Sequence, residues 1–275
     1  MATSTITSSH AGRRPSRIPV RKIGEGDLRF ALRAGWDDFM DMRGDIFIAG
    51  LVYTFIGLAA VVMTTSRPLI PFFFPVVAGI GLLGPVAAVG FYELAKRREA
   101  HEENLHWFNF LDVRKRASVD DMGIVACLLL AIFALWLVAA GVLYVSLFGW
   151  STPTSIGGFV TVIYTTGLGW ALILGGAIIG AVFGWVVLAL SVVSLPMLVD
   201  CNVSAGEAVS ASWRAAHANK PEMIRWGLTV LGLLVLGSIP AFVGLAVVLP
   251  WLGYSTWHLY TRLIDRDSIP KRRRG

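Results

Sequence analysis

The most constraining feature of this sequence is a stretch of 78 residues, Met122 to Val199, without one Asp, Glu, Lys, Arg or His. A transmembrane helix needs about 20 consecutive apolar residues, so this stretch can cross a bilayer more than once. The whole chain agrees, since 15% of its residues are charged, against about 25% in ordinary soluble domains. The sequence therefore predicts an all-α, polytopic bundle of transmembrane helices.

Turn signals divide the chain into about six spans. The turn Arg67-Pro68 separates the first two spans, and a break at 149–158, rich in Gly, Ser, Thr and Pro, divides the long charge-free stretch. The last apolar run, Trp226 to Thr261, is interpreted as a hairpin that turns near Pro240. Whether this run forms two short spans or a re-entrant hairpin stays open. The spans are predicted at about 46–66, 69–95, 122–147, 167–195, 224–239 and 242–260.

Polar segments flank one membrane domain, predicted at 26–265. Residues 1–25 lack the apolar core of a signal peptide and are interpreted as a flexible cytoplasmic tail. Residues 266–275 form a basic cytoplasmic tail. The stretch Gly26 to Arg43 has the apolar spacing of an amphipathic helix, with Asp27 as the expected N-cap. Such a helix either lies on the inner membrane surface or packs beneath the bundle.

Two local signals place helix starts near the end of the chain. Ser204 and Glu207 have the spacing of a capping box that opens a helix through about Ala218. Pro221 suits the first turn of the following helix, because proline lacks the backbone N–H that this turn leaves unpaired.

The distribution of Lys and Arg predicts the orientation. With six spans and the N-terminus inside, the inner segments hold 8, 6, 3 and 6 of these residues, and Arg67 alone lies outside. This is the positive-inside bias. We therefore expect a bacterial inner-membrane protein with both termini in the cytoplasm. The net charge is +6, and the basic residues that produce it flank the apolar spans. The expected partner is therefore the lipid bilayer, and binding of nucleic acid is not expected.

Two residue sets are candidates for specific interactions. Gly176, Gly180 and Gly184 form a GxxxGxxxG face in span four, which lets a helix of this chain or of another protein approach closely. Glu93 and His258 lie about one turn inside the inner membrane boundary and could form a polar site there. The alternative is that the Glu93 side chain snorkels to the membrane interface and that His258 is an interfacial residue, with no contact between the two.

Motifs for catalysis and cofactors are weak. The sequence has no G-x-S-x-G elbow, Walker loop or HExxH. Its single ExxH, Glu103 to His106, lies in a charged juxtamembrane segment, where a solvated helix is the simpler interpretation. No His lies deep in a predicted span, which disfavours haem ligation. We therefore expect a protein that is not an enzyme and has no cofactor or metal.

Four stretches together carry a family resemblance. They are Ala34–Phe39, Leu83–Leu94, Ser194–Asp200 with Ala208–Ser212 and Asn219, and Leu249–Tyr260. With them the chain resembles the bacterial membrane family called domain of unknown function 2189, over about Ile23 to Asp265. Members are often labelled cytochrome c oxidase subunits, which implies association with a respiratory oxidase and not catalysis. The Ser194 to Asn219 portion also resembles the membrane domain of glycerophosphodiester phosphodiesterases.

Two functions follow as expectations. The first is a non-enzymatic accessory or assembly partner of a larger membrane complex, a respiratory one if the family label applies, with the glycine face of span four as the contact or as a surface for self-association. The second is a small transporter or lipid-handling protein that uses the polar helix breaks around Pro85, Pro196 and Pro250.

Overall fold

The computed structural model of the chain describes residues 18–42, 88–102, 119–150, 155–240 and 242–269, together with residue 109 and isolated positions between 50 and 86. The elements formed by these residues are helices, and an isolated antiparallel bridge joins Val20 to Ile264. The predicted span at 46–66 and most of the span at 69–95 lie outside the described residues. The helices are α1 (Glu25–Asp41), α4 (Val89–Glu99), α5 (Val119–Phe148), α6 (Ile156–Thr165), α7 (Gly167–Ser191), α8 (Ser194–Asp200), α9 (Ala205–Ala218), α10 (Lys220–Ser238) and α11 (Leu245–Leu263), followed by the 3-10 turn Arg266–Ser268.

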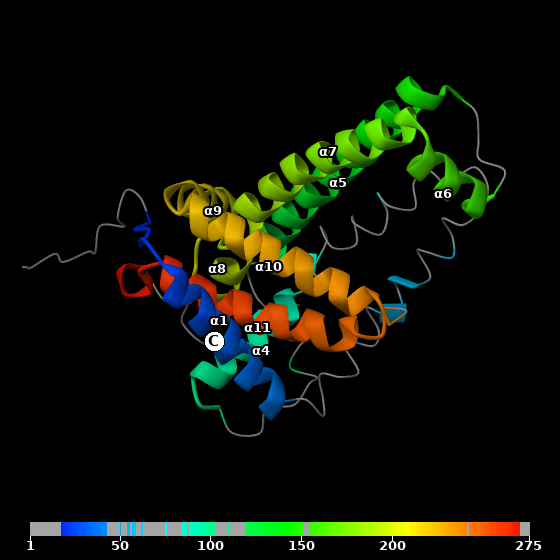
Figure 1. Cartoon of the computed structure of the whole chain (residues 1–275). Helices are drawn as coiled ribbons and strands as arrows, with labels where there is room; N and C mark the ends of the chain where they lie inside the picture. Colours follow the sequence, from blue (N-terminus) through cyan, green and yellow to red (C-terminus); the bar gives the residue numbers. More distant parts are fainter. Residues whose placement is uncertain are drawn as a thin grey trace, which may run out of the picture.

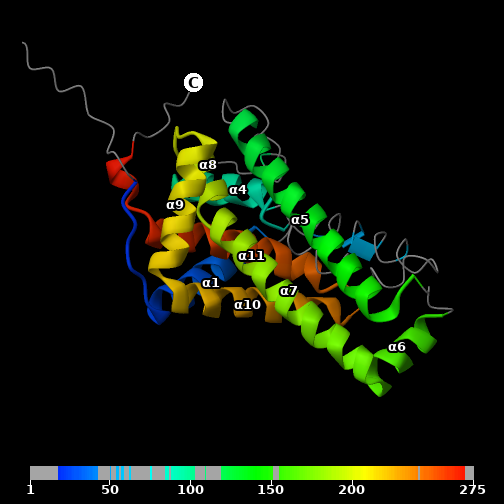
Figure 2. The same ribbon diagram turned by 90° about the horizontal axis from the view of Figure 1, so that it is seen from above.

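The two longest helices, α5 and α7, form an arm that projects from the rest of the molecule (Figures 1 and 2). They meet at Gly175, where an added Cβ would lie 3.1 Å from Leu143 Cδ1. The short helix α6 packs on α7 at the end of the arm and buries Phe159 and Ile163 against Tyr144. Ser155 caps α6 by accepting a hydrogen bond from the backbone N–H of Gly158, 3.1 Å away. Helix α6 therefore begins at the end of the predicted break and lies between two predicted spans.

The described residues contain two helical segments long and apolar enough to cross a membrane, Val119–Phe148 and Gly167–Asp200. Their outer faces carry large aliphatic side chains. Soluble monomers rarely expose apolar patches larger than a few hundred Å², so a surface of this kind is suited to lipid. Exposed examples on α5 and α7 are Ile124, Leu135, Val138, Val142, Leu174, Ile178 and Val182.

Helix α11 is the centre of the fold and packs against α1, α4, α8 and α10. Its Tyr254, Trp257 and Tyr260 are among the largest fully buried side chains of the described residues. Gly253 allows the contact with α4, because a Cβ there would lie 2.8 Å from Phe91 Cβ. A helix enclosed in this way contributes its side chains to the protein core more than to a lipid-facing surface.

Helix α1 confirms the helix expected near Gly26, but its N-cap differs from the prediction. Gly24 is the N-cap, and Asp27 lies inside the first turn, where its Oδ2 accepts a hydrogen bond from Gly24 N at 3.0 Å. The expectation for Asp27 was wrong because the capping box places its acidic residue three positions after the cap. Helix α1 packs on α11 through Leu28, Ala31, Gly35, Asp38 and Phe39. This is the packed alternative; contact of its outer side with the membrane surface stays a prediction.

The helix of the predicted fourth span ends earlier than expected. Helix α7 ends at Ser191, and Pro196 lies in the first turn of α8, not at the break. A proline is tolerated there because the first turn of a helix leaves its N–H groups unpaired. The actual break is at Val193, whose backbone N–H donates to the buried hydroxyl of Ser212 at 3.1 Å. A side chain 19 positions away therefore helps to set this helix boundary.

The last three helices follow the local sequence signals closely. Ser204 and Glu207 form the expected capping box, and α9 ends at Ala218. Pro221 lies in the first turn of α10. Helices α10 and α11 cover the stretches interpreted as the last two spans, and the chain reverses between them near Pro240. Gly244 permits this tight reversal, since a Cβ there would lie 2.8 Å from Gly237 Cα.

Candidate functional site

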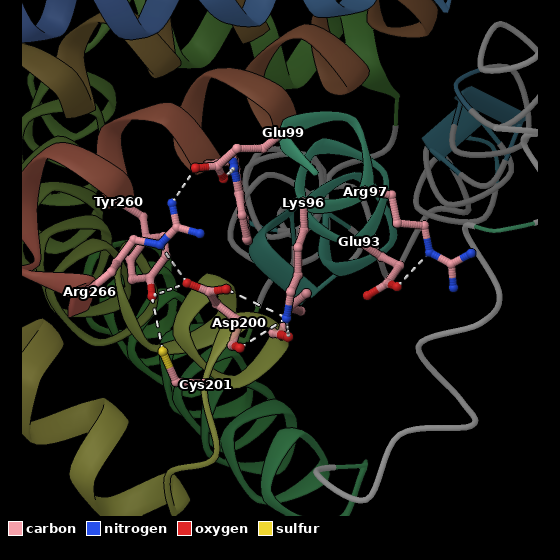
Figure 3. A network of polar contacts seen from close by, with 10 residues as sticks. Glu93, Lys96, Arg97, Glu99, Asp200, Cys201, Tyr260 and Arg266 are labelled. Carbon is pink, nitrogen blue, oxygen red and sulfur yellow. Dashed lines mark hydrogen bonds and ion pairs between the residues drawn. The ribbon is translucent and has the colours of Figure 1, made fainter. Parts of the chain in front are cut away.

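A buried polar cluster joins α4, α8, α11 and the 3-10 turn (Figure 3). Its central residue is Asp200, the last residue of α8, which is 9% exposed. Asp200 Oδ2 accepts hydrogen bonds from Arg266 Nε at 2.7 Å and from Tyr260 Oη at 3.0 Å. Lys96 Nζ lies 3.5 Å from Asp200 Oδ1. One carboxylate therefore connects three separate parts of the chain.

Lys96 has a second role at the C-terminal end of α8. Its ammonium group donates to the carbonyl oxygens of Val199 at 2.8 Å and Asp200 at 2.9 Å. The last carbonyl groups of a helix lack partners within the helix and carry partial negative charge. Lys96 satisfies two of them and so attaches α4 to the end of α8.

Arg266 extends the cluster toward the surface. Its Nη1 donates to Glu99 Oε1 at 2.6 Å, and Trp257 Nε1 donates to Glu99 Oε2 at 3.2 Å. Burial lowers the pKa of the Arg266 guanidinium, but hydrogen bonds and charge from Glu99 and Asp200 outweigh burial and raise this pKa above its ordinary value. Arg266 is therefore a fixed positive charge at every physiological pH.

Cys201 lies beside this cluster with its Sγ 3.6 Å from Tyr260 Oη. Burial, followed by the negative charge of Asp200, raises the pKa of the Cys201 thiol to about 11. A thiol with such a pKa is almost wholly protonated near neutral pH, and the thiolate is the nucleophilic form. This geometry makes Cys201 a packing residue and a poor nucleophile.

The two residues predicted to form a polar site each contact a different polar partner. Glu93 is fully buried, and its Oε1 accepts from Arg97 Nε at 2.8 Å on the same helix. His258 Nε2 lies 2.8 Å from Asp38 Oδ2 of α1, and Arg98 Nε lies 2.7 Å from Asp38 Oδ1. The contact of Glu93 therefore lies within α4, whereas the contact of His258 joins α11 to α1. A shared site remains a prediction.

The glycine face of α7 is largely open. Within the described part of the chain, no atom lies within 4 Å of an ideal Cβ on Gly176 or Gly184. A Cβ on Gly180 would meet Trp136 Cζ2 at 3.9 Å, an ordinary contact. The residue that lets α5 approach α7 is instead Gly175. The predicted face is thus present, and α5 packs beside it at Gly175 and reaches it at Gly180 through Trp136.

The sequence did not predict the Asp200 cluster, although Ser194–Asp200, one of the stretches that carry the family resemblance, ends at the central residue of the cluster. One signal was available: Asp200 is the first charged residue after the 78-residue stretch. A carboxylate at that point must reach water or a cation. Its partners lie 66 and 104 positions away, so local patterns could not name them.

The long apolar helices, their exposed aliphatic faces and the polar clusters at the helix ends define a helical integral membrane protein. Residues 73–200 match the family model described as "Predicted integral membrane protein (DUF2189)". This match confirms the resemblance drawn from the sequence over that part of the chain. Comparison with curated proteins and with solved structures gives no match.

Proposed function

We propose that this chain is a multi-pass protein of the bacterial inner membrane that assists a larger membrane complex without catalysing a reaction. The proposal includes six spans with both termini in the cytoplasm, an arrangement that the positive-inside bias favours. A respiratory complex is the first candidate partner, because the family resemblance drawn from the sequence implies association with an oxidase. Two features of the structure support an accessory role: the glycine face of α7 and the buried charged groups around Asp200.

The open glycine face of α7 is the observation that carries the proposal. Small residues at spacing i, i+4, i+8 allow helix backbones to approach closely in a membrane. Helix α5 packs at Gly175 and leaves Gly176 and Gly184 open among the described residues. In addition, the buried charged groups Asp200, Lys96 and Arg266 join elements of the chain to one another. These two features favour a rigid scaffold with one helix face prepared for another helix.

The experiment is native mass spectrometry of the tagged full chain after gentle extraction from its own membrane. We expect other membrane subunits, or a second copy, to co-purify with the wild type and to be lost from Gly176→Leu. Ala171→Leu is the matched control, because Ala171 is an exposed small residue on a different face of α7. The proposal would be contradicted if the wild-type chain carried no partner even after cross-linking. It would also be contradicted if Gly176→Leu and Ala171→Leu lost their co-purifying subunits equally.

A lipid-handling or transport role is the second candidate. A hollow of about 460 Å³ at the end of α11 supports it, because charged and aromatic side chains line that hollow. Co-purification of lipid with an otherwise single chain would favour this candidate over the accessory role.

A further inference from the structure

The hollow at the end of α11 lies between the N-terminal segment, α1, α4 and the 3-10 turn, and it measures about 460 Å³. Ligand pockets in proteins commonly have volumes of about 300–1,000 Å³. The hollow is open on one side. His258, which lies about one turn from the predicted inner membrane boundary, is one of the residues that line it. A ligand here would therefore lie at the depth of lipid headgroups.

Charges of both signs line the hollow. Three arginines, Arg21, Arg262 and Arg266, share its wall with two carboxylates, Glu99 and Asp267. A simple anion would meet the carboxylates, and a simple cation would meet the arginines. A ligand with a phosphate and an ammonium group a few bonds apart can satisfy both, because each end finds the opposite charge.

Arg262 is the arginine best placed to hold the phosphate. Its guanidinium carbon lies 4.0 Å above the centre of the Phe30 ring, and its side chain is 45% exposed. Stacking occupies the face of the guanidinium and leaves its edge of N–H donors for a ligand. Its Nε lies 3.9 Å from Asp27 Oδ1, beyond direct hydrogen-bond distance. Phe30 therefore orients Arg262 without using the donors that a phosphate needs.

The other two arginines are held by carboxylates. Arg266 is fixed by Glu99 and Asp200 (Figure 3), and Arg21 Nη2 lies 2.5 Å from Asp265 Oδ1. They supply positive potential at fixed positions, whereas the Arg262 guanidinium makes no direct hydrogen bond to a side chain among the described residues and keeps its donors for a ligand. A preformed arrangement of this kind lowers the ordering cost of binding.

We propose that this hollow binds a zwitterionic phosphoethanolamine group, with the phosphate at Arg262 and the ammonium toward Glu99 and Asp267. The group belongs either to a phosphatidylethanolamine headgroup or to a soluble phosphoethanolamine. The inference does not depend on a partner complex, so it can fail or succeed independently of the proposed accessory role.

The test is native mass spectrometry of the full chain in detergent, titrated with phosphatidylethanolamine, phosphatidylglycerol or phosphatidylcholine of matched acyl chains. We expect phosphatidylethanolamine to be retained best, because phosphatidylglycerol lacks the ammonium and phosphatidylcholine lacks its N–H donors. Arg262→Gln should weaken this binding roughly tenfold, the loss expected when one charge-assisted hydrogen bond is removed. Asp267→Asn should reduce the preference for phosphatidylethanolamine over phosphatidylglycerol.

Arg29→Gln is the matched control, since Arg29 lies on the same α1 as Phe30 and its side chain is 82% exposed. Thermal unfolding of each variant without lipid shows that the fold is retained, and Phe30→Leu tests the stacking separately. Competition by soluble phosphoethanolamine, without any lipid preference, would support the site with a soluble source. Equal retention of the three lipids with no such competition, or equal binding by Arg262→Gln and Arg29→Gln, would overturn the proposal.

Discussion

Gly35 of α1 lies directly against Ser255 of α11, and a Cβ added to Gly35 would lie 2.6 Å from Ser255 Cα. Real Cβ atoms do not approach a backbone atom so closely. This contact brings Asp38, one turn further along α1, within reach of His258, one turn further along α11. The glycine therefore sets the distance between the two helices and allows the polar contact between Asp38 and His258 beside it.

Gly35→Ala should destabilise the protein by about 1–3 kcal/mol, the usual cost of overpacking a filled core. The effect should appear as a lower midpoint in a thermal or denaturant titration in detergent micelles. Gly26→Ala is the control in the same helix, because no atom of the described residues lies within 4 Å of its ideal Cβ. That change should be neutral or slightly stabilising, since alanine favours a helix over glycine. Equal midpoints for the two variants would argue against close packing of α1 on α11.

Asp200→Asn should cost about 3 kcal/mol, because it leaves Arg266 and Lys96 partly buried near a neutral group. A double-mutant cycle with Arg266→Gln measures the pair itself, and we expect a clear coupling energy. Asp37→Asn serves as the control, since Asp37 is an exposed residue of α1. Additive effects of Asp200→Asn and Arg266→Gln would mean that the two side chains do not stabilise each other.

Asn219 fastens the N-terminal segment to the start of α10. Its Oδ1 accepts from Ile23 N at 2.9 Å, and its Nδ2 donates to Arg21 O at 3.1 Å and to Ala215 O at 3.0 Å. Asn219→Ala removes all three bonds from a side chain that is 2% exposed, at a cost of about 1–3 kcal/mol for the groups left unpaired. Hydrogen exchange should then become faster at Ile23, and protease cleavage near residues 18–24 should increase.

The control for this change is Asn202→Ala, because Asn202 is exposed in the loop before α9. It should leave exchange at Ile23 unchanged. Unaltered exchange in Asn219→Ala as well would show that the β-bridge between Val20 and Ile264 holds the segment without the side chain.

The sequence predicts the features that depend on neighbouring residues. The capping box at Ser204, the first turn at Pro221 and the apolar lengths of α5 and α7 are all local properties, and the structure has them. The end of α7 was misplaced because Ser212, which binds Val193, lies in a later helix. A proline is a strong local signal, but here it begins a helix.

The polar contacts follow a different rule, because their partners are far apart in the sequence. Asp38 and His258 are separated by 220 positions, and Asp200 and Arg266 by 66. One sequence shows that a charge near an apolar helix needs a partner. Which partner it receives depends on the packing of α1 and α4 around α11, and this packing is a property of the tertiary fold.

Cys201 should react slowly with a membrane-permeant alkylating reagent at pH 8. Its pKa of about 11, against an ordinary value of 9.0, lowers the thiolate fraction about a hundredfold at this pH, since each unit of pKa is a factor of ten. Burial slows access further. Because the raised pKa disfavours the thiolate, the rate should keep rising as the pH increases toward 11. The measurement is mass spectrometry of Cys127→Ser, which removes the exposed thiol. A rate that is half-maximal near pH 9, as expected for the ordinary pKa of 9.0, would contradict the raised pKa.

The topology can be tested with thiols placed on opposite sides of the membrane. Ser155→Cys lies at the exposed start of α6, between two predicted spans, and should react with an impermeant maleimide added to intact cells. Arg274→Cys lies in the basic tail, outside the described residues, and should react only after the cells are opened.

The wild-type chain is the control for both variants, since its Cys201 is buried and its Cys127 lies on the apolar α5. The six-span arrangement places an odd number of spans between Ser155 and Arg274, so the two thiols must lie on opposite sides. Labelling of both from outside would leave an even number of spans between them, so α10 and α11 together would cross the membrane once and would not form a hairpin. Labelling in the reverse order would place the basic clusters outside and end the positive-inside argument for this chain.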